Sequence, residues 1–441
     1  MTSTLPHLAG NYAPVSEELT AHELPVTGTI PPELSGWYLR NGPNPHDAAS
    51  AHWFFGDGMI HGVRLTGGRA VSYRNRWVRT RSFTGETVLH RPDGTVDLTA
   101  SAANTHVVKH AGRLLALVES SYPYEITAEL DTIGPYDFDG RLRTAMTAHP
   151  KTCPTTGELH FFGYGGLRPP YLTYHRANAE GELVLSRPID VPANTMAHDF
   201  ALTAEHVVFF DLPVVFDRNR VGHGMPYHWD ENYQARIGVL RRDDPHGEVR
   251  WLPINPCYVF HTLNAHDEGD RIVLHVVRYP RLFDDGPKVG ATLWRWTVEL
   301  ATGKVIEDQV DDRTGEFPRI DDRLTGRAVR FGHATTAARP DGDPFARTAA
   351  TFSSLTRYDL ATGTSVSHEF GVGRVPGEAA FVPADGTPDG PGWLMTYVYD
   401  SATDRSDLVV LDADRLAAPP VATIQLPARV PFGFHGNWIA D

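Results

Sequence analysis

ELATGKVIE (residues 299–307) and DLATGTSVS (359–367) are two occurrences of a turn-like segment that recurs through the chain. Related segments are RANAEGELV (176–184) and RDDPHGEVR (242–250), and the glycines of the four turns are 66, 56 and 60 residues apart. Apolar or aromatic residues typical of strands precede the turns. A period near 60 residues with several short strands in each repeat is typical of propeller blades. At this period the 441 residues correspond to about seven blades.

One histidine or glutamate follows each of these turns at nearly the same distance. His198, His261, Glu316 and Glu378 lie 17, 14, 13 and 15 residues after the glycine of the preceding turn. Blades are arranged radially, so one phase of the repeat always faces the central axis. We therefore expect these residues to meet on the axis, although they are far apart in the sequence.

Two further histidines and one glutamate stand in comparably distinctive segments. His149 lies in TAHPK, His435 in FGFHGNW and Glu119 in LLALVESS. Imidazole suits iron, zinc, copper or nickel, and a metal-bound histidine usually donates its other ring N–H to a carboxylate or a backbone carbonyl. The pattern predicts one metal centre, with histidines 149, 198, 261 and 435 as ligands and glutamates 119, 316 and 378 around them.

Composition and charge restrict the class of protein. The 40 glycines and 34 prolines fit many turns between short strands. A net charge of −14 disfavours nucleic acid as a partner, because phosphate binding needs clustered Lys and Arg. Cys153 and Cys257 are too few for a disulfide scaffold or a thiolate metal site.

No signal-peptide pattern or bilayer-spanning apolar run is present in the sequence, so we expect a cytoplasmic protein. Peripheral membrane contact stays open as an alternative. We expect residues 1–30 to form an extended lead-in and residues 31–441 to form a single propeller domain. A hairpin is predicted over residues 106–120. The acidic segment 308–322 is predicted as a solvated loop with Glu316 as its one inward-facing residue.

Several longer motifs resemble the carotenoid cleavage oxygenase family. They are LSGWYLRNGPNP (34–45), HWFFGDGMIHGVRL (52–65), TAHPKTCPTTGELHFFGY (147–164), MAHDFALTAEHVVFFD (196–211) and FHGNW (434–438), among others. The resemblance covers nearly the entire chain in order. It implies an all-β fold, a seven-bladed β-propeller with a dome of loops and short helices covering the metal face.

The resemblance also implies a cofactor and a reaction. It implies one non-haem Fe(II) per chain, held by the four histidines, with the three glutamates around them. Thr105 matches a position near an open iron coordination site. In this family O2 adds across an electron-rich C=C bond, which is split into two carbonyl products. We therefore expect an Fe(II)-dependent dioxygenase whose partners are O2 and a carotenoid or apocarotenoid.

Val118 bears on the choice of substrate. It stands directly before Glu119, where relatives that cleave phenolic stilbenes have a lysine that binds the phenolate. A buried valine offers no counter-charge to a phenolate, so Val118 favours an apolar polyene as substrate. The same chemistry on a stilbene or phenylpropenoid is the alternative, and some relatives isomerise a polyene ester instead. A non-catalytic propeller that binds a ligand is a third reading, disfavoured because no predicted ligand is missing.

Most of the 22 histidines in the chain are expected to be structural or exposed. We assign such roles to His52, His61, His106, His110, His266 and His275. His266 lies five residues after His261, whereas a strand places residues an even number apart on one face. This spacing gives no support for metal binding by both His261 and His266.

Overall fold

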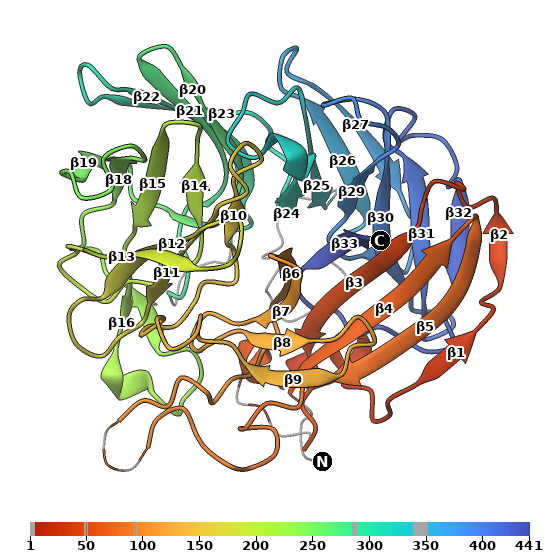
Figure 1. Ribbon diagram of the computed structural model, residues 1–441. Coiled ribbons are helices and arrows are strands. Elements are labelled where there is room, and N and C mark those ends of the chain that lie inside the picture. Colours follow the sequence, from red (N-terminus) through yellow and green to blue (C-terminus); the bar gives the residue numbers. More distant parts are fainter. Residues whose placement is uncertain are drawn as a thin grey trace.

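Seven β-sheets stand around a central axis as the blades of a propeller (Figure 1). The computed structural model describes residues 5–47, 50, 52–91, 93, 95–284, 289–337 and 352–441. Within these ranges helix is confined to short 3₁₀ turns, namely η1 (Pro6–Leu8), η2 (Gly10–Tyr12), η3 (Trp53–Phe55), η4 (Arg218–Arg220) and η5 (Asp322–Leu324). The predicted all-β, seven-bladed architecture is confirmed.

Five consecutive blades are four-stranded antiparallel sheets, each with its first strand nearest the axis (Figure 1). The first consists of β6 (His106–His110), β7 (Arg113–Leu117), β8 (Tyr124–Ile126) and β9 (Thr132–Pro135). The second consists of β10 (Lys151–Thr152), β11 (Leu159–Tyr164), β12 (Leu172–Ala177) and β13 (Leu183–Ile189). The third consists of β14 (Phe200–Leu202), β15 (His206–Asp211), β18 (Arg236–Arg241) and β19 (Arg250–Pro253). The fourth consists of β20 (Tyr258–Glu268), β21 (Arg271–Tyr279), β22 (Thr292–Glu299) and β23 (Val305–Gln309). The fifth consists of β24 (Gly315–Arg319), β25 (Phe331–Thr336), β26 (Ser354–Asp359) and β27 (Thr364–Glu369).

The two remaining blades combine both ends of the chain. One has the order β1 (Thr20–His22), β5 (Arg69–Trp77), β4 (Gly58–Thr66), β3 (Gly36–Pro43), β33 (Gly436–Ala440). The other has the order β2 (Val26–Gly28), β32 (Ala422–Gln425), β31 (Arg405–Asp412), β30 (Gly392–Asp400), with β28 (Arg374–Pro376) and β29 (Ala380–Pro383) both paired to β30. A separate ribbon is formed by β16 (Val214–Phe216) and β17 (Tyr227–Trp229).

The ring closes where β33 pairs antiparallel with β3, so that a C-terminal strand completes a sheet begun near the N-terminus (Figure 1). The segment predicted as a lead-in also takes part, because β1 pairs with β5 and β2 pairs with β32. Residues 1–4 of that segment lie outside the described residues.

The four recurring turns join the third and fourth strands of four consecutive blades. Gly181, Gly303 and Gly363 have φ of 89°, 76° and 69°, in the left-handed region that glycine adopts without steric cost. Gly247 has a different reason for lacking a side chain, since a Cβ there would lie 2.2 Å from Asp244 Oδ2. The period read from the sequence is therefore the spacing of these outer hairpins.

Two local predictions have different outcomes. The hairpin predicted over residues 106–120 is formed by β6 and β7. The prediction of a solvated loop over 308–322 is wrong for residues 308–309, which end β23, and for residues 315–319, which form β24, the innermost strand of its blade. Glu316 is not the one inward-facing residue, because Phe317 and Pro318 are buried as well. The residues of β24 are largely buried, and its pairing shifts register between Glu316 and Arg319. Such a bulge interrupts the side-chain alternation by which a strand is recognised in sequence.

Apolar side chains of adjacent blades pack together to form the core. In one cluster Phe210 and Ile237 of one blade pack with Leu274 and Trp296 of the next. The rings of Phe210 and Trp296 meet edge to face at 6.0 Å between centroids. Among the described residues, no helix has the length and apolar character that crossing a bilayer would require.

Candidate metal centre

The four predicted histidine ligands come together on the propeller axis from four different blades. His149 and His198 lie two residues before the first residues of the inner strands β10 and β14, His261 lies in β20, and His435 immediately precedes β33. One ring nitrogen from each of the four lies within 4.8 Å of the others. All four side chains are buried, with 4% to 8% of their surface exposed.

The spacing of the ring nitrogens fits a metal ion. His198 Nε2 lies 2.9 Å from His149 Nε2 and 3.3 Å from His261 Nε2. Imidazole nitrogens bind a metal such as zinc at about 2.0–2.1 Å. Two such ligands at right angles lie about 3 Å apart, and two opposite ligands about 4 Å apart. The observed spacing lies close to these values, so the four histidines could hold one ion.

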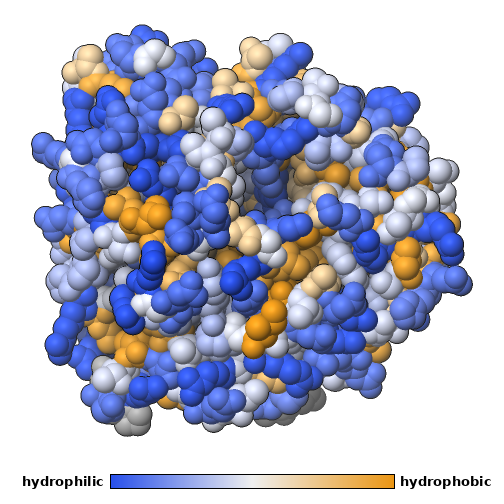
Figure 2. All heavy atoms as spheres, in the orientation of Figure 1, coloured by the Kyte–Doolittle hydropathy of each residue, from blue (hydrophilic) through white to orange (hydrophobic). Residues whose placement is uncertain are grey.

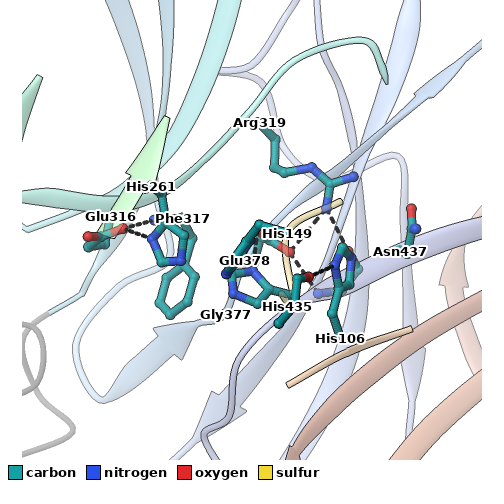
Figure 3. A network of polar contacts seen from close by, with 12 residues as sticks. His106, His149, His261, Glu316, Phe317, Arg319, Gly377, Glu378, His435 and Asn437 are labelled. Carbon is teal, nitrogen blue, oxygen red and sulfur yellow. Dashed lines mark hydrogen bonds and ion pairs between the residues drawn. The ribbon is translucent and has the colours of Figure 1, made fainter. Parts of the chain in front are cut away.

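A carboxylate contacts the second ring nitrogen of three of the histidines. Glu316 Oε2 lies 2.5 Å from His261 Nδ1, and Glu378 Oε1 lies 3.0 Å from His435 Nδ1 (Figure 3). Glu119 forms an ion pair with His198 through Nδ1. A carboxylate that accepts from Nδ1 fixes the tautomer, which leaves Nε2 with a free lone pair for a metal. No carboxylate pairs with His149 in the part of the chain described.

Further donors fix the three carboxylates in turn. Glu316 Oε2 accepts from the backbone N–H of Phe317 at 2.7 Å. Glu378 Oε2 accepts from the backbone N–H of Gly436 at 2.7 Å and from Arg319 Nη1 at 3.1 Å. The Tyr164 hydroxyl donates to Glu119 Oε2. Each glutamate is thus held from a second side.

Electrostatics within the site differ among the ligands. Burial, together with the neighbouring histidines, lowers the pKa of both His149 and His435 well below the ordinary value. Burial also disfavours the charged form of His261, but Glu316, with Asp199 and Glu378, outweighs this effect and raises the pKa of His261. The low pKa of His149 and His435 favours the neutral imidazole that a metal requires.

A buried ion pair that the sequence did not reveal lies beside the cluster. Lys151 Nζ is 2.9 Å from Asp199 Oδ1. Burial favours the neutral acid, but Lys151 and the Thr262 backbone N–H lower the pKa of Asp199 below its usual value. Lys151 and Asp199 belong to the motifs TAHPK and MAHDF, yet a single sequence offers no reason to pair them.

An apolar cavity of about 830 Å³ opens onto the cluster. Its wall includes three of the four histidines, His198, His261 and His435. The other side chains that line it are mainly apolar and aromatic, among them Phe54, Val118, Met196, Tyr227, Phe260, Phe317 and Phe434. Loops and the 3₁₀ helix η3 supply much of this wall, as expected for a dome over the metal face.

Thr105, predicted near the metal, and Val118, predicted to contact substrate, both line this cavity. Val118 and Thr105 are buried in its wall, 9% and 6% exposed. The Thr105 hydroxyl donates to Asn104 Oδ1 at 2.9 Å, and the Thr105 carbonyl accepts from the backbone N–H of His435 at 3.1 Å. The hydroxyl proton of Thr105 is therefore already engaged in a hydrogen bond. Its backbone carbonyl anchors the segment that carries His435.

The six histidines assigned other roles lie outside the four-histidine group of the described residues. His106 nevertheless lies near it, with its ring centroid 5.2 Å from that of His435 (Figure 3). His106 Nδ1 is 3.1 Å from the carbonyl oxygen of Ala148. Sequence reasoning also missed Arg319 and Tyr164, which contact the carboxylates and not the predicted ligands.

Comparisons with known proteins agree with this geometry. Residues 12–440 match the family of the retinal pigment epithelial membrane protein. The carotenoid cleavage oxygenase of Mycobacterium tuberculosis is 41% identical, with 98% of this chain and 97% of that protein covered.

Two solved structures share the fold over nearly their whole length. The lignostilbene dioxygenase of Pseudomonas brassicacearum is 31% identical, with a TM-score of 0.87 over 99% of this chain and 98% of that chain. A cobalt-substituted apocarotenoid oxygenase of Synechocystis is 28% identical, with a TM-score of 0.86 over 97% of each chain. This chain is thus a dioxygenase that belongs to the carotenoid cleavage oxygenase family.

Proposed function

We propose that this enzyme uses Fe(II) and O2 to cleave a C=C bond of a carotenoid or apocarotenoid into two carbonyl products. The observation that carries the proposal is a cluster of four buried imidazoles at the wall of a large apolar cavity. An alkene in the cavity would lie against His198, His261 and His435, and therefore next to a bound metal.

The donor set supports a divalent transition metal with free coordination positions. We assign His149, His198, His261 and His435 as the residues that would hold it. A bound Fe(II) would supply the activation of O2 for addition across the double bond. The cobalt-substituted Synechocystis enzyme supports the assignment of a transition metal.

The protein's own groups prepare this site. Glu119, Glu316 and Glu378 orient three of the imidazoles and offset the charge of the metal. Phe260 and Phe317 belong to the cavity wall and pack beside the histidines, with the Phe260 ring centroid 4.9 Å from that of His198. These rings exclude water from the reacting bond. We place Thr105 beside an open coordination position, where it shapes access to the metal.

The character of the cavity supports an apolar, elongated substrate. Its volume of about 830 Å³ suits a molecule larger than a single aromatic ring, and its wall is mainly hydrocarbon. The Mycobacterium tuberculosis relative, named as a carotenoid cleavage oxygenase, supports the same class.

The second candidate substrate is a hydroxylated stilbene or phenylpropenoid, a reading that the likeness to the Pseudomonas brassicacearum lignostilbene dioxygenase supports. Val118 counts against it, because a phenolate beside this valine would lose hydration without gaining a counter-charge. Tyr164 and Tyr227 also line the cavity. Burial and Glu119 raise the pKa of each phenol, so each stays neutral and offers a phenolate no counter-charge.

Product analysis tests the reaction. Fe(II)-loaded protein is incubated with a panel of carotenoids and apocarotenoids and a panel of 4-hydroxystilbenes under ¹⁸O-labelled O2, and product masses are measured. We expect two labelled carbonyl products from the polyenes and a higher kcat/KM for that panel. A higher kcat/KM for the 4-hydroxystilbenes would promote the second candidate.

Metal analysis tests the ligand assignment and separates an enzyme from a non-catalytic propeller. Replacing any of the four histidines by alanine is expected to remove iron and activity together, because each supplies one bond to the same ion. His246→Ala, at an exposed turn, is the control. Full iron content and turnover in a variant would refute that ligand. A wild-type chain that binds no iron would support a non-catalytic ligand-binding role.

The rim of the cavity supports uptake of substrate from an apolar phase. Phe55, Val96, Leu167 and Val221 line the cavity and are exposed, with 43% to 51% of their surface open to solvent. Elsewhere, the face drawn in Figure 2 is mainly hydrophilic, with apolar residues in small groups. We propose peripheral contact of this rim with membranes. Binding to neutral lipid vesicles that survives Leu167→Asp and Val221→Asp would refute it.

A further inference from the structure

The ion pair of Lys151 and Asp199 connects two segments that carry ligands. Lys151 is two residues after His149, and Asp199 directly follows His198. The 2.9 Å contact between Lys151 Nζ and Asp199 Oδ1 joins the inner strands of two neighbouring blades. The Asp199 side chain is 1% exposed and that of Lys151 20% exposed, so water screens this pair weakly.

Asp199 also reaches the third ligand segment. Its Oδ2 accepts from the Thr262 backbone N–H at 2.8 Å and from the Thr262 hydroxyl at 2.9 Å. Thr262 directly follows His261. Asp199 Oδ1 accepts from the Phe200 backbone N–H at 2.8 Å in addition to the contact with Lys151. An ionised carboxylate satisfies four such donors as an acceptor, which is the form this surrounding requires.

Arg319 plays the same part at the fourth ligand. It donates to Glu378 Oε2 at 3.1 Å and to the carbonyl oxygen of Gly436 at 2.7 Å, and Gly436 directly follows His435 (Figure 3). The Arg319 side chain is 12% exposed and that of Glu378 2% exposed. Arg319 also contacts Asp322, but that carboxylate is 60% exposed, so its charge is offset mainly by water.

The charged side chains that contact a proposed ligand, its glutamate or the residue next to a ligand can be counted. The carboxylates are Glu119, Glu316, Glu378 and Asp199, and the cations are Lys151 and Arg319. These contacting groups carry four negative and two positive charges, a net charge of −2 that is equal and opposite to that of a divalent ion. Arg40, a buried cation that also interacts electrostatically with Glu378, lies outside this contacting set. Charges in a site of low dielectric interact strongly, and the ion's own charge belongs in the count.

We infer that Lys151 and Arg319 are positioning residues that match the charge of this shell to a divalent ion and so favour Fe(II) over Fe(III). The inference rests on the metal site of the proposed function. Without Lys151, the shell would carry one surplus negative charge and would stabilise the trivalent ion more than the divalent one. Without the charge of Asp199, the shell would carry one negative charge too few, and the preference would shift the opposite way.

This reasoning separates a charge-matching role from a merely structural clamp. Lys151→Met removes the positive charge and keeps the length of the chain, and Asp199→Asn removes the negative charge while its amide oxygen still accepts from Thr262. A structural clamp would be weakened by both changes in the same sense. Charge matching requires shifts of opposite sign, and near restoration when the two changes are combined.

The experiment measures the Fe(III)/Fe(II) midpoint potential of the iron-loaded protein in a redox titration followed by electron paramagnetic resonance. We expect Lys151→Met and Arg319→Gln to lower the potential, Asp199→Asn to raise it, and the Lys151→Met/Asp199→Asn variant to lie close to wild type. Lys304→Met, at an exposed turn, and Asp308→Asn, on the exposed side of β23, are the matched controls and are expected to leave the potential unchanged.

The outcomes separate the inference from the function on which it rests. Iron-loaded wild type that cleaves no alkene would overturn the proposed reaction, whereas the potentials would still decide the inference. Equal potentials in wild type and Asp199→Asn, or shifts of the same sign in Lys151→Met and Asp199→Asn, would overturn the inference alone. Where Lys151→Met does not fold well enough to load iron, Asp199→Asn decides by itself, and a potential at or below that of wild type overturns the inference.

Discussion

At the scale of single residues, Val118 has the clearest consequence for substrate choice. It lies in the cavity wall directly before Glu119. Val118→Lys is expected to raise kcat/KM for a 4-hydroxystilbene relative to a polyene by about 10-fold, because a hydrogen bond to a charged group contributes about 1.5–3 kcal/mol. Steady-state kinetics on both substrates measure the change, and Val372→Lys, at a fully exposed position, is the control. An unchanged ratio would show that Val118 does not contact the end of the substrate.

The glutamates behind the ligands give a second prediction at this scale. Glu378→Gln, Glu316→Gln and Glu119→Gln keep the shape of the side chain and remove its charge. Such changes typically cost about 10–100-fold in metal affinity or activity. Competition with a chelator measures the affinity, and Glu369→Gln, on an exposed strand end, is the control. Wild-type metal affinity in all three variants would show that these glutamates do not contribute to metal binding.

At the scale of elements, the closing strand β33 links the fold to the site. Gly436 is its first residue, and a Cβ there would lie 2.6 Å from the hydroxyl oxygen of Tyr38, a fully buried side chain that donates to the Glu378 carbonyl. Gly436→Ala is therefore expected to destabilise the protein by about 1–3 kcal/mol, as overpacking does. It should also weaken metal binding, because the Gly436 N–H holds Glu378.

Thermal unfolding and metal affinity measured on the same samples test this prediction. Gly386→Ala is the matched control, since a Cβ there would meet no atom within 4 Å. A Gly436→Ala protein as stable as this control would show that Tyr38 moves aside. Loss of stability with unchanged metal affinity would mean that the closing strand and the site are independent.

Elements differ in how far the sequence reveals them. The outer hairpins are visible because their glycine turns recur. The inner strand β24 was taken for a loop because acidic residues flank it and because Phe317, with φ of 56°, and Pro318 interrupt its alternation. β10 is only two residues long, too short for any periodic pattern. Inner strands at the site are thus short or irregular, and even the eleven-residue β20, which carries His261, shifts register twice near that residue.

At the scale of the whole molecule, the number of blades and the meeting of His198 and His261 on the axis could be predicted from one period, whereas His149 and His435 were predicted from their distinctive segments. The contacts of Lys151, Arg319 and Tyr164 could not, since they depend on which side chains face each other across blades. A repeat fixes the phase of a residue and not its partner on the next blade. Arg319 even lies within the segment that was predicted as a loop.

Buried neutral histidines give the fold as a whole a dependence on pH. Burial lowers the pKa of His175 from 6.5 to about 4, and its ring nitrogens bond to Thr144 and Ser186. The unfolded chain therefore binds this proton at a higher pH than the native protein does. The contribution of neutral His175 to the free energy of unfolding is fully present above pH 6.5 and is lost as the pH falls towards about 4. For a pKa shift of this size the contribution is up to about 3 kcal/mol.

His175→Gln is expected to be less stable at pH 7 and to lose less stability between pH 6.5 and 4 than wild type. Urea unfolding of metal-free protein at several pH values measures both slopes. The exposed His246→Gln should keep the wild-type slope. An unchanged slope in His175→Gln would show that this side chain does not take up a proton on unfolding.

Closure of the ring by β33 has a consequence for biosynthesis. The ribosome adds His435 only after it has made the other three ligands and all the other inner strands. A nascent polypeptide therefore presents at most three of the imidazoles, in a propeller whose first sheet still lacks its partner strand. Messages that stop before codon 435 would therefore yield products that lack one of the four proposed ligands.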